Sequence, residues 1–314
     1  MNYKIDTDKG TEKDIDYIDI FDLLLAIYKK KMLILLASIF ALGMSALYSI
    51  SLPNIYTSET LLVSNNQAKS MSSMLGSYSM IANIAGVELP GESNTKTQEA
   101  IERLKSLEFF SSYILPEVKA EDLFAVSRWD MIENTIIYDE NIFDSRTKKW
   151  VRKYSPPMSV EPSSQELHKK FLQNFSVTFY KDTGFVSLQY SHKSPYVAKD
   201  WLDVITFNIN ESMRNEDKDA SLRSINFLNT QSEKNRIAEI GDVISQLLKS
   251  QMETLMLASA SDNYVFKVIE KPYVPELKSS PSRSFIVIFG TFLGLILSLT
   301  FIIAQEFFKK RSTK

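Results

Sequence analysis

The chain has 314 residues, of which 44% are hydrophobic and 24% charged, with two histidines and no cysteine. The lack of cysteine excludes disulfides and thiolate metal sites, and a formal net charge of −2 provides no basic field of the kind that binds nucleic acid. The middle of the chain has the composition of a globular domain, but two long apolar stretches near the ends do not.

Residues 32–52 form the first apolar stretch, 21 residues without a charge. A helix of about 20 apolar residues crosses the hydrocarbon core of a bilayer, and the uncharged residues 285–304 meet the same condition. The first stretch is longer than the core of a cleavable signal peptide and follows 31 residues that include several acidic ones. We therefore interpret it as an uncleaved anchor and expect two membrane spans.

Lysines beside the first span indicate its orientation. The three that directly precede it are Lys29, Lys30 and Lys31. The 20 residues after the span contain a single positively charged residue, Lys69. Because positive flanks remain in the cytoplasm, residues 1–31 and, after an even number of spans, residues 305–314 are predicted to be cytoplasmic. Residues 53–284 would then form a periplasmic domain anchored in a bacterial inner membrane.

The first part of this domain mixes strand and helix signals. Tyr56–Val63 alternates polar and apolar residues, which predicts a strand directly after the first span. Residues 64–96, rich in Ser, Asn, Gly and Met, are interpreted as a loop with room for a short helix at Met71–Ile84. Apolar residues at helical spacing predict a helix over Thr97–Tyr113. Residues 117–162 have no clear pattern.

A capped helix and a hairpin are predicted next. Ser164–Gln173 has a helical pattern, with Ser163 or Ser164 as its N-cap. Ser176–Tyr180 and Phe185–Tyr190 alternate around a four-residue connection that contains Asp and Gly. These turn residues between two alternating segments predict a β-hairpin.

A long helical region follows, over about residues 195–258. Ser194 caps it and Pro195 suits its first turn, and no further proline occurs before Pro272. Unbroken, its 64 residues would extend about 95 Å; the polar stretch Asn215–Ala220 is a candidate position for a break. Its second half carries an apolar line at spacings of three and four, which predicts a seam for a partner helix or for other copies of the chain. The seam residues are Ile237, Ile240, Ile244, Leu247 and Leu255.

Val265–Ile269 predicts a returning strand, and prolines then stiffen the approach to the second span. Proline fixes φ and favours extended chain, so residues 272–283 are expected to couple the external domain to the membrane. Within the second span, two glycines four residues apart permit close helix packing in lipid. The residues proposed for coupling and packing are Pro272, Pro275, Pro281, Arg283, Gly290 and Gly294.

Taken together, these local patterns resemble the Wzz-like chain length determinants, also called polysaccharide co-polymerases. Tyr17–Ile20 and Asp22–Leu24 precede the first span, and Tyr56–Ser58 follows it. The segment from Lys271 to Arg283, with its prolines, leads directly into a span with two glycines, and this arrangement is the most specific part of the resemblance. At both ends of the chain the resemblance lies in the residues themselves. In the middle it lies only in the order of the expected strands and helices.

The resemblance implies an α+β fold, with an α/β base domain near the membrane, a long protruding helix and two flanking transmembrane helices. It implies a homo-oligomeric ring that sets how many repeat units a polymerase adds to a surface glycan. O-antigen of lipopolysaccharide is the leading expectation, and capsule or exopolysaccharide is the alternative. The implied partners are other copies of the chain, the polymerase, the growing lipid-linked glycan and membrane lipid.

Some relatives carry a cytoplasmic tyrosine kinase domain after the second span. Ten residues follow the span in this sequence, so a kinase is expected only as a separate partner, within the capsule or exopolysaccharide alternative. A two-span envelope sensor is the alternative from another class. Such a receptor needs a cytoplasmic output domain, for which ten residues are too few.

The residues carry no signature of catalysis. No nucleophile elbow, Walker loop or zinc-protease motif occurs. His168 and His192 are the only histidines, and acidic pairs such as Asp200 and Asp203 suit solvated helix faces. We therefore predict a regulator without enzymatic activity, cofactor or metal.

Overall fold

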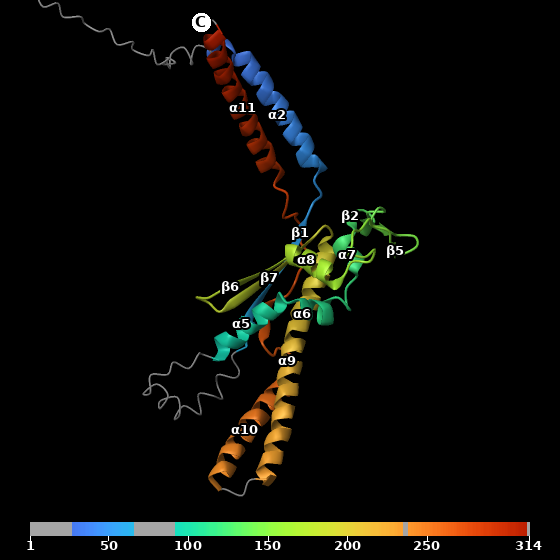
Figure 1. The fold of residues 1–314 in the computed structure, drawn as a ribbon, viewed down its shortest axis with the longest axis vertical. Helices are drawn as coiled ribbons and strands as arrows, with labels where there is room; N and C mark the ends of the chain where they lie inside the picture. The colour runs from blue at the N-terminus through green and yellow to red at the C-terminus, as the bar shows by residue number, and fades with distance from the viewer. Residues whose placement is uncertain (1–26, 66–91, 235–237, 313–314) are drawn as a thin grey trace, which may run out of the picture. The chain divides into compact units, whose positions relative to one another are not determined.

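The computed structural model describes residues 27–65, 92–234 and 238–312, which form two compact units. One unit contains the chain up to Leu52 and from Pro281 onward, and the other comprises Pro53–Ser280. We call them the span unit and the base unit. Figure 1 shows their helices and strands along the chain.

A four-stranded antiparallel sheet lies at the centre of the base unit. The strands follow the order β6-β7-β1-β8, and their bounds are β1 Tyr56–Ser64, β6 Phe175–Tyr180, β7 Phe185–His192 and β8 Phe266–Glu270. The predicted strands are therefore confirmed. The predicted hairpin is β6–β7, and its connection ends at Gly184 with φ of 73°, a conformation that suits glycine.

One face of this sheet is buried under helix α9, Pro195–Lys234. Alternate residues of β1 point to that face, and in the register with β7 they oppose Val186, Leu188 and Tyr190. The ring of Tyr190 stacks on Trp201 of α9 with centroids 5.1 Å apart and an interplanar angle of 8°. The two-residue period of the strands thus builds one apolar layer between the sheet and α9.

Shorter helices pack around this layer. They are α5 Glu92–Leu104, α6 Leu107–Phe109, the π-helical turn η2 Phe110–Ile114, α7 Ala120–Phe124 and α8 Ser164–Asn174. The capped helix was predicted correctly: Ser163 and Glu166 form a reciprocal capping box at the start of α8. The single helix predicted over Thr97–Tyr113 is wrong, because Ser106 has extended backbone and accepts the Phe109 N–H, so it ends one helix and caps the next.

Residues 117–162, which showed no pattern, contain two small hairpins as well as α7. One pairs β2 Val126–Asp130 with β3 Thr135–Tyr138, and the other pairs β4 Phe143–Asp144 with β5 Lys149–Trp150. Strands of two to five residues are too short for an alternating pattern to identify. The helix proposed at Met71–Ile84 lies outside the described residues.

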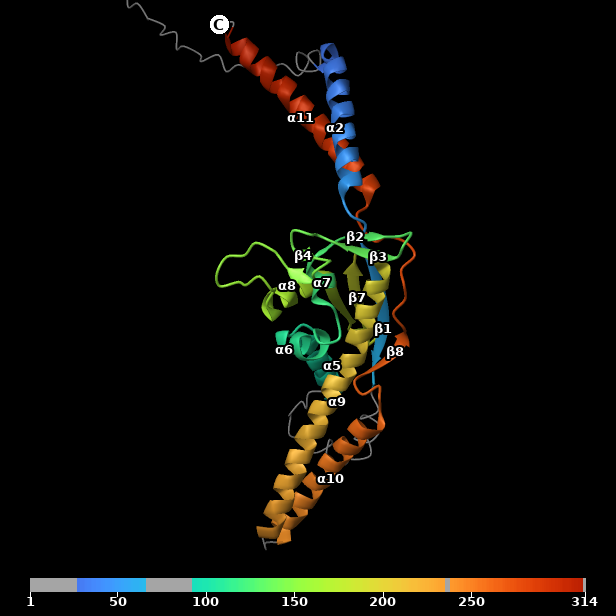
Figure 2. The same ribbon diagram turned by 90° about the vertical axis from the view of Figure 1, so that its right-hand side faces the viewer.

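The long helical region is two helices. Helix α9 continues through Asn215–Ala220, where a break was considered, and α10 spans Ala238–Ala260. The two helices lie side by side and antiparallel, as both views of the ribbon show (Figures 1 and 2). We call this helix pair the arm. The chain turns back instead of extending a single helix of about 95 Å.

The span unit is a pair of packed helices, α2 Lys31–Ser51 and α11 Arg283–Ser312. By length and composition, two helices among the described residues are suited to cross a membrane, Lys31–Ser51 and Arg283–Gln305. They coincide with the two apolar stretches of the sequence.

Asn210 of α9 joins the helix to the start of β8 and is nearly buried. Its amide nitrogen donates to the Phe266 carbonyl at 3.0 Å, and its amide oxygen accepts the Val265 and Phe266 N–H groups at 2.9 Å each. Backbone groups buried without a partner cost about 1–3 kcal/mol each, so this one side chain stabilises the junction of arm and sheet.

Replacing Asn210 with Ala should lower the unfolding free energy of the base unit by about 3 kcal/mol or more, because three buried backbone groups lose their partner. Urea unfolding of the detergent-solubilised chain, followed by tryptophan fluorescence, measures this, since all three tryptophans lie in the base unit. Asn229→Ala, at an exposed position of the same helix, is the matched control and should change stability by less than about 1 kcal/mol. Equal losses in both variants would contradict the assigned role.

Candidate functional site

The two glycines of the second span lie at its contact with the first span. A Cβ added to Gly290 would come within 2.5 Å of the Ser45 Cβ, and one added to Gly294 would overlap the Ala41 Cβ. Neither position therefore accepts a side chain without moving a helix. The geometry is that of small residues bringing two helices close together in lipid.

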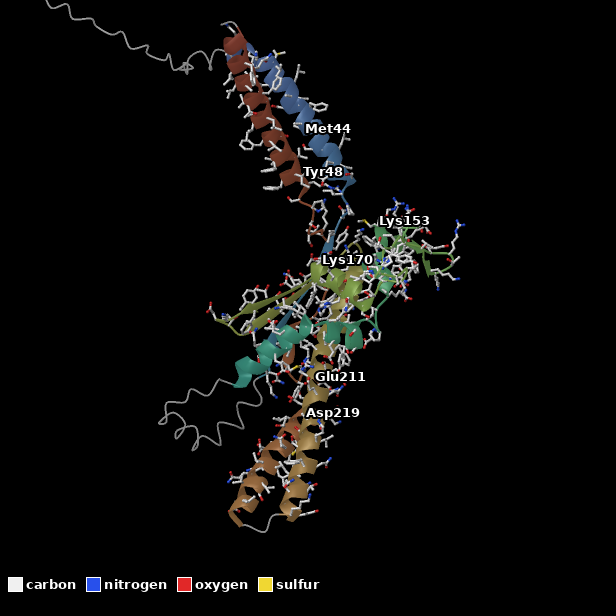
Figure 3. The ribbon with its side chains drawn as sticks, viewed as in Figure 1. Met44, Tyr48, Lys153, Lys170, Glu211 and Asp219 are labelled. Atoms are coloured by element: carbon white, nitrogen blue, oxygen red, sulfur yellow. The ribbon has the colours of Figure 1, made fainter. Side chains whose placement is uncertain are left out.

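The first span supplies the complementary half of this contact, which the sequence analysis missed. Ala37, Ala41 and Ser45 lie on one face at intervals of four residues, and the Ala37 carbonyl oxygen is 3.9 Å from the Cβ position of Gly294. Moving four residues back along α2 corresponds to moving four residues forward along α11, which is antiparallel packing. Met44 and Tyr48, off this face, are exposed (Figure 3). Repeated small residues at a spacing of four were the available signal.

The predicted topology lysines lie where the N-terminal end of α2 meets the C-terminal part of α11. Lys30 precedes α2 and donates from its Nζ to the Gln305 side-chain oxygen at 2.7 Å. The Lys31 ammonium lies 4.6 Å from the centre of the Tyr28 ring, and Lys29 is exposed. The same antiparallel register therefore extends from the glycines to this polar end of the helix pair.

The proline-containing segment lies along β1 in the base unit. Pro272 and Pro275 are buried there. Proline has no N–H and cannot form a strand ladder. Side chains of β1 bond carbonyl oxygens at the end of β8 and at the start of this segment: the Ser58 hydroxyl donates to the Tyr273 carbonyl at 2.7 Å, and the Thr60 hydroxyl donates to the Glu270 carbonyl at 2.6 Å.

Backbone hydrogen bonds close the base unit where the segment ends. The Ile55 N–H donates to the Ser280 carbonyl at 2.9 Å, and the Ser279 N–H donates to the Ile55 carbonyl at 2.8 Å. We call these paired residues the clip. The clip keeps the first and last residues of the base unit together. Pro281 and Arg283 follow it directly, and α11 begins at Arg283.

The predicted seam on α10 lies partly against α9, a helix of the same chain. Ile244 is 6% exposed, whereas Ile240 and Leu247 are 39% and 47% exposed and Leu255 is intermediate. Ile237 lies outside the described residues. The buried line passes through Ile244 and Ala258, and Leu248, half-buried, lies nearer to it than Leu247. The predicted residues therefore divide between a contact with α9 and an outward flank.

A polar contact joins the arm to α5 and to the residues before β8. The Asp217 carboxylate accepts from Lys96 at 2.8 Å and from the Tyr264 hydroxyl at 2.6 Å. Burial and the hydrogen bond to Asp217 raise the pKa of Tyr264 to about 12. Burial acts to lower the pKa of Lys96, but the bond to Asp217 outweighs it and the pKa is raised. Both groups therefore keep their protons at neutral pH, and the contact persists.

A comparison with models of known protein families finds a match for the N-terminal third of the chain. The model of the family described as "Chain length determinant protein" (Wzz) matches residues 16–115. The resemblance is thereby confirmed. The matched segment covers α2, β1 and α5 to η2; the proline-containing segment and the second span, which were considered the most specific part, lie outside it. Comparison with curated protein sequences gave no match.

Two solved structures align with the chain at low similarity. One is described as a full-length bacterial polysaccharide co-polymerase, at 12% identity and a TM-score of 0.38 over 94% of this chain and 100% of that chain. The other is a fragment of WzzB, a polysaccharide co-polymerase from Salmonella Typhimurium, at 13% identity and a TM-score of 0.30 over 72% of this chain and 100% of that chain. At these scores neither alignment carries an argument.

Replacing both Gly290 and Gly294 with Leu should separate α2 from α11, because each new side chain overlaps the facing helix. The chain has no cysteine, so a disulfide between Lys30→Cys and Gln305→Cys can report the helix pair in membranes. We expect most of this disulfide to be lost in the double Leu variant. Gly43→Leu is the matched control, since nothing lies within 4 Å of its Cβ position. A disulfide yield unchanged by the double variant would show that the helices do not need this contact.

Ile244 and Leu247 allow the inward and outward sides of α10 to be compared. Ile244→Asp places a charge against α9 and should weaken the arm by roughly 2–4 kcal/mol, whereas Leu247→Asp should change it by about 0.5 kcal/mol or less. Hydrogen exchange of α10 amides measures this, because opening of the arm accelerates exchange without unfolding the sheet. Equal exchange rates in the two variants would contradict the assigned orientation.

Proposed function

We propose that the chain is a non-enzymatic regulator of surface polysaccharide chain length that acts as a homo-oligomer beside a polymerase. The match to the chain length determinant family over residues 16–115 carries this proposal. That segment includes the first span and the strand at the centre of the sheet. O-antigen of lipopolysaccharide is the polymer we propose first.

We place the protein in the inner membrane, with both termini in the cytoplasm and residues 53–284 in the periplasm. The run of lysines from Lys29 to Lys31 supports this orientation. The antiparallel contact of α2 with α11 supports two spans that return the chain to its starting side. The bond between Lys30 and Gln305 joins the two helix ends that face the cytoplasm in this arrangement.

The arm supports lateral assembly. At about 100° per residue, Ile240, Val243 and Leu247 lie on one side of the buried line of α10, and Met252 and Met256 lie on the other; all five are exposed. Single exposed apolar residues are ordinary, but apolar groups on both flanks suit a helix with a neighbour on each side. Different contacts on the two flanks generate a ring when the rotation closes.

The contacts of both histidines indicate a structural role for these side chains, in agreement with a non-enzymatic function. His192 is buried, its Nε2 lies 2.8 Å from the Asp122 carbonyl, and its Nδ1 accepts the Ser194 N–H at 3.0 Å. The Nε2 of His168 lies 2.9 Å from the Lys105 carbonyl. Each ring thus binds backbone and holds elements together. In the proposed mechanism, a ring of such bases presents a repeated surface to the polymerase or the growing glycan, and this surface biases extension against release.

The test separates assembly from folding. Val243→Asp with Leu247→Asp places charges on the outward flank and should leave the arm folded while it lowers the mass of the detergent-extracted particle. In cells that carry this variant at matched expression, the surface glycan should lose its preferred length, as it should after gene deletion. Gel separation of the glycan measures this, with Asn229→Ala as the control. A wild-type length distribution after deletion would contradict the proposed function.

A further inference from the structure

The turn between β2 and β3 exposes two consecutive large apolar residues, a feature that the function proposed above does not use. Ile132 is 96% exposed and Met131 is 68% exposed. The polar side chains of the turn bind its own backbone: the Asp130 carboxylate accepts the Ile132 and Glu133 N–H groups at 2.8 and 3.2 Å. Hydrogen bonds from those N–H groups hold the pKa of Asp130 below its usual value. The turn therefore keeps its form without burying the two apolar side chains.

This hairpin is fixed to the end of the base unit at which β1 starts. The Trp129 ring meets the Tyr56 ring edge-on, with centroids 5.6 Å apart, and lies 6.2 Å from the Tyr196 ring at the start of α9. The Trp129 Nε1 donates to Asn134 across the turn at 2.9 Å. Figure 2 shows β2 and β3 lying across this end of the base unit.

Chain length limits how far this end can be from the first span. Helix α2 ends at Ser51 and β1 begins at Tyr56, and five extended residues reach about 18 Å at most. The clip keeps Ser280 beside Ile55, and only Pro281 and Ser282 separate Ser280 from the start of α11 at Arg283. If α2 and α11 cross a bilayer, these connections keep the Tyr56 end of the base unit within about 18 Å of the end of the first span, and the headgroup layer occupies several ångströms of that distance.

Cations accompany the apolar side chains. Residues 143–160 contain five Lys and Arg residues against one Asp. The Asp144 carboxylate accepts the N–H groups of its own turn, and Arg152 is paired with Glu166. The remaining cations of this segment are all exposed: Arg146, Lys148, Lys149 and Lys153. Figure 3 labels Lys153 on this part of the base unit. Exposed Val151, Tyr154 and Met158 lie among them in the chain.

From these observations we infer that the β2–β3 turn and residues 143–160 form a membrane-contact surface, with Met131 and Ile132 entering the interface and the cations binding anionic phospholipid headgroups. Apolar side chains beside Lys and Arg are the composition of interfacial membrane binding. The inference is independent of glycan control and depends only on both spans crossing the bilayer. It gives the base unit a third attachment to the membrane, besides the two chain connections.

Single-cysteine labelling tests this surface in the 314-residue chain, which contains no cysteine. A fluorophore on Ile132→Cys is compared with one on Tyr180→Cys, in nanodiscs of phosphatidylethanolamine and phosphatidylglycerol. Tyr180 ends β6 and, through Phe185 of β7, aligns with Val63, at the opposite end of β1 from Tyr56. Both positions are exposed, so neither label disturbs the core.

The label at residue 132 should be quenched several-fold more by lipids brominated near the headgroup than the label at residue 180, and less by aqueous iodide. Phosphatidylcholine in place of phosphatidylglycerol, or Lys148→Gln with Lys149→Gln, should reduce this lipid quenching. Strong iodide quenching at residue 132 would overturn the inference. Protection from both quenchers would also overturn it, because a protein surface would then cover the turn. Lipid quenching that is unchanged without phosphatidylglycerol would overturn the role of the cations.

Discussion

The base unit depends on the clip, the pair of backbone hydrogen bonds between Ile55 and Ser279–Ser280. Because the first and last residues of the unit are held together, the strand that follows Ile55 becomes an inner strand of the sheet and the segment that precedes Ser279 must run back beside it. Three prolines near this segment prevent an ordinary ladder. The hydroxyls of Ser58 and Thr60 donate to carbonyl oxygens of the chain that runs back beside β1, which explains why two polar residues occupy buried positions of this strand.

Local signals predicted much of this fold, and long-range contacts account for most of what they missed. The N-cap of α8, which was expected at Ser163 or Ser164, the cap at Ser194 and the alternation of β6 and β7 are properties of neighbouring residues, and each was predicted correctly. The reversal between α9 and α10 was not predicted, since a continuous helical pattern has the same period whether the helix extends or turns back. The packing of Ile244 and its neighbours on α9 favours the reversed arrangement. Apolar periodicity shows that a helix has a packing face, but it does not show which helix packs there.

In the span unit, too, the local pattern was recognised in the sequence but the residues that it contacts were not. Gly290 and Gly294 were identified because two glycines four residues apart stand out in an apolar helix. Their partners are Ala41 and Ser45, and small residues of that kind are common in any span. An isolated pattern of Ala and Ser has little meaning until a facing helix with gaps at the same interval is known. Pairing the two patterns in antiparallel order would have predicted the contact, since both repeat every four residues.

The arm and the sheet differ in how completely the chain buries them. The layer under α9 is closed by large side chains such as Tyr190 and Trp201, and it needs no other molecule. Helix α10 packs mainly on α9 and leaves apolar side chains on both flanks exposed to solvent. A helix pair with this little burial opens at low free energy in isolation, and neighbours on either side would remove that exposed surface from water. In the proposed oligomer, ordering of the arm and assembly would therefore stabilise each other, whereas the layer under α9 is already closed within one chain.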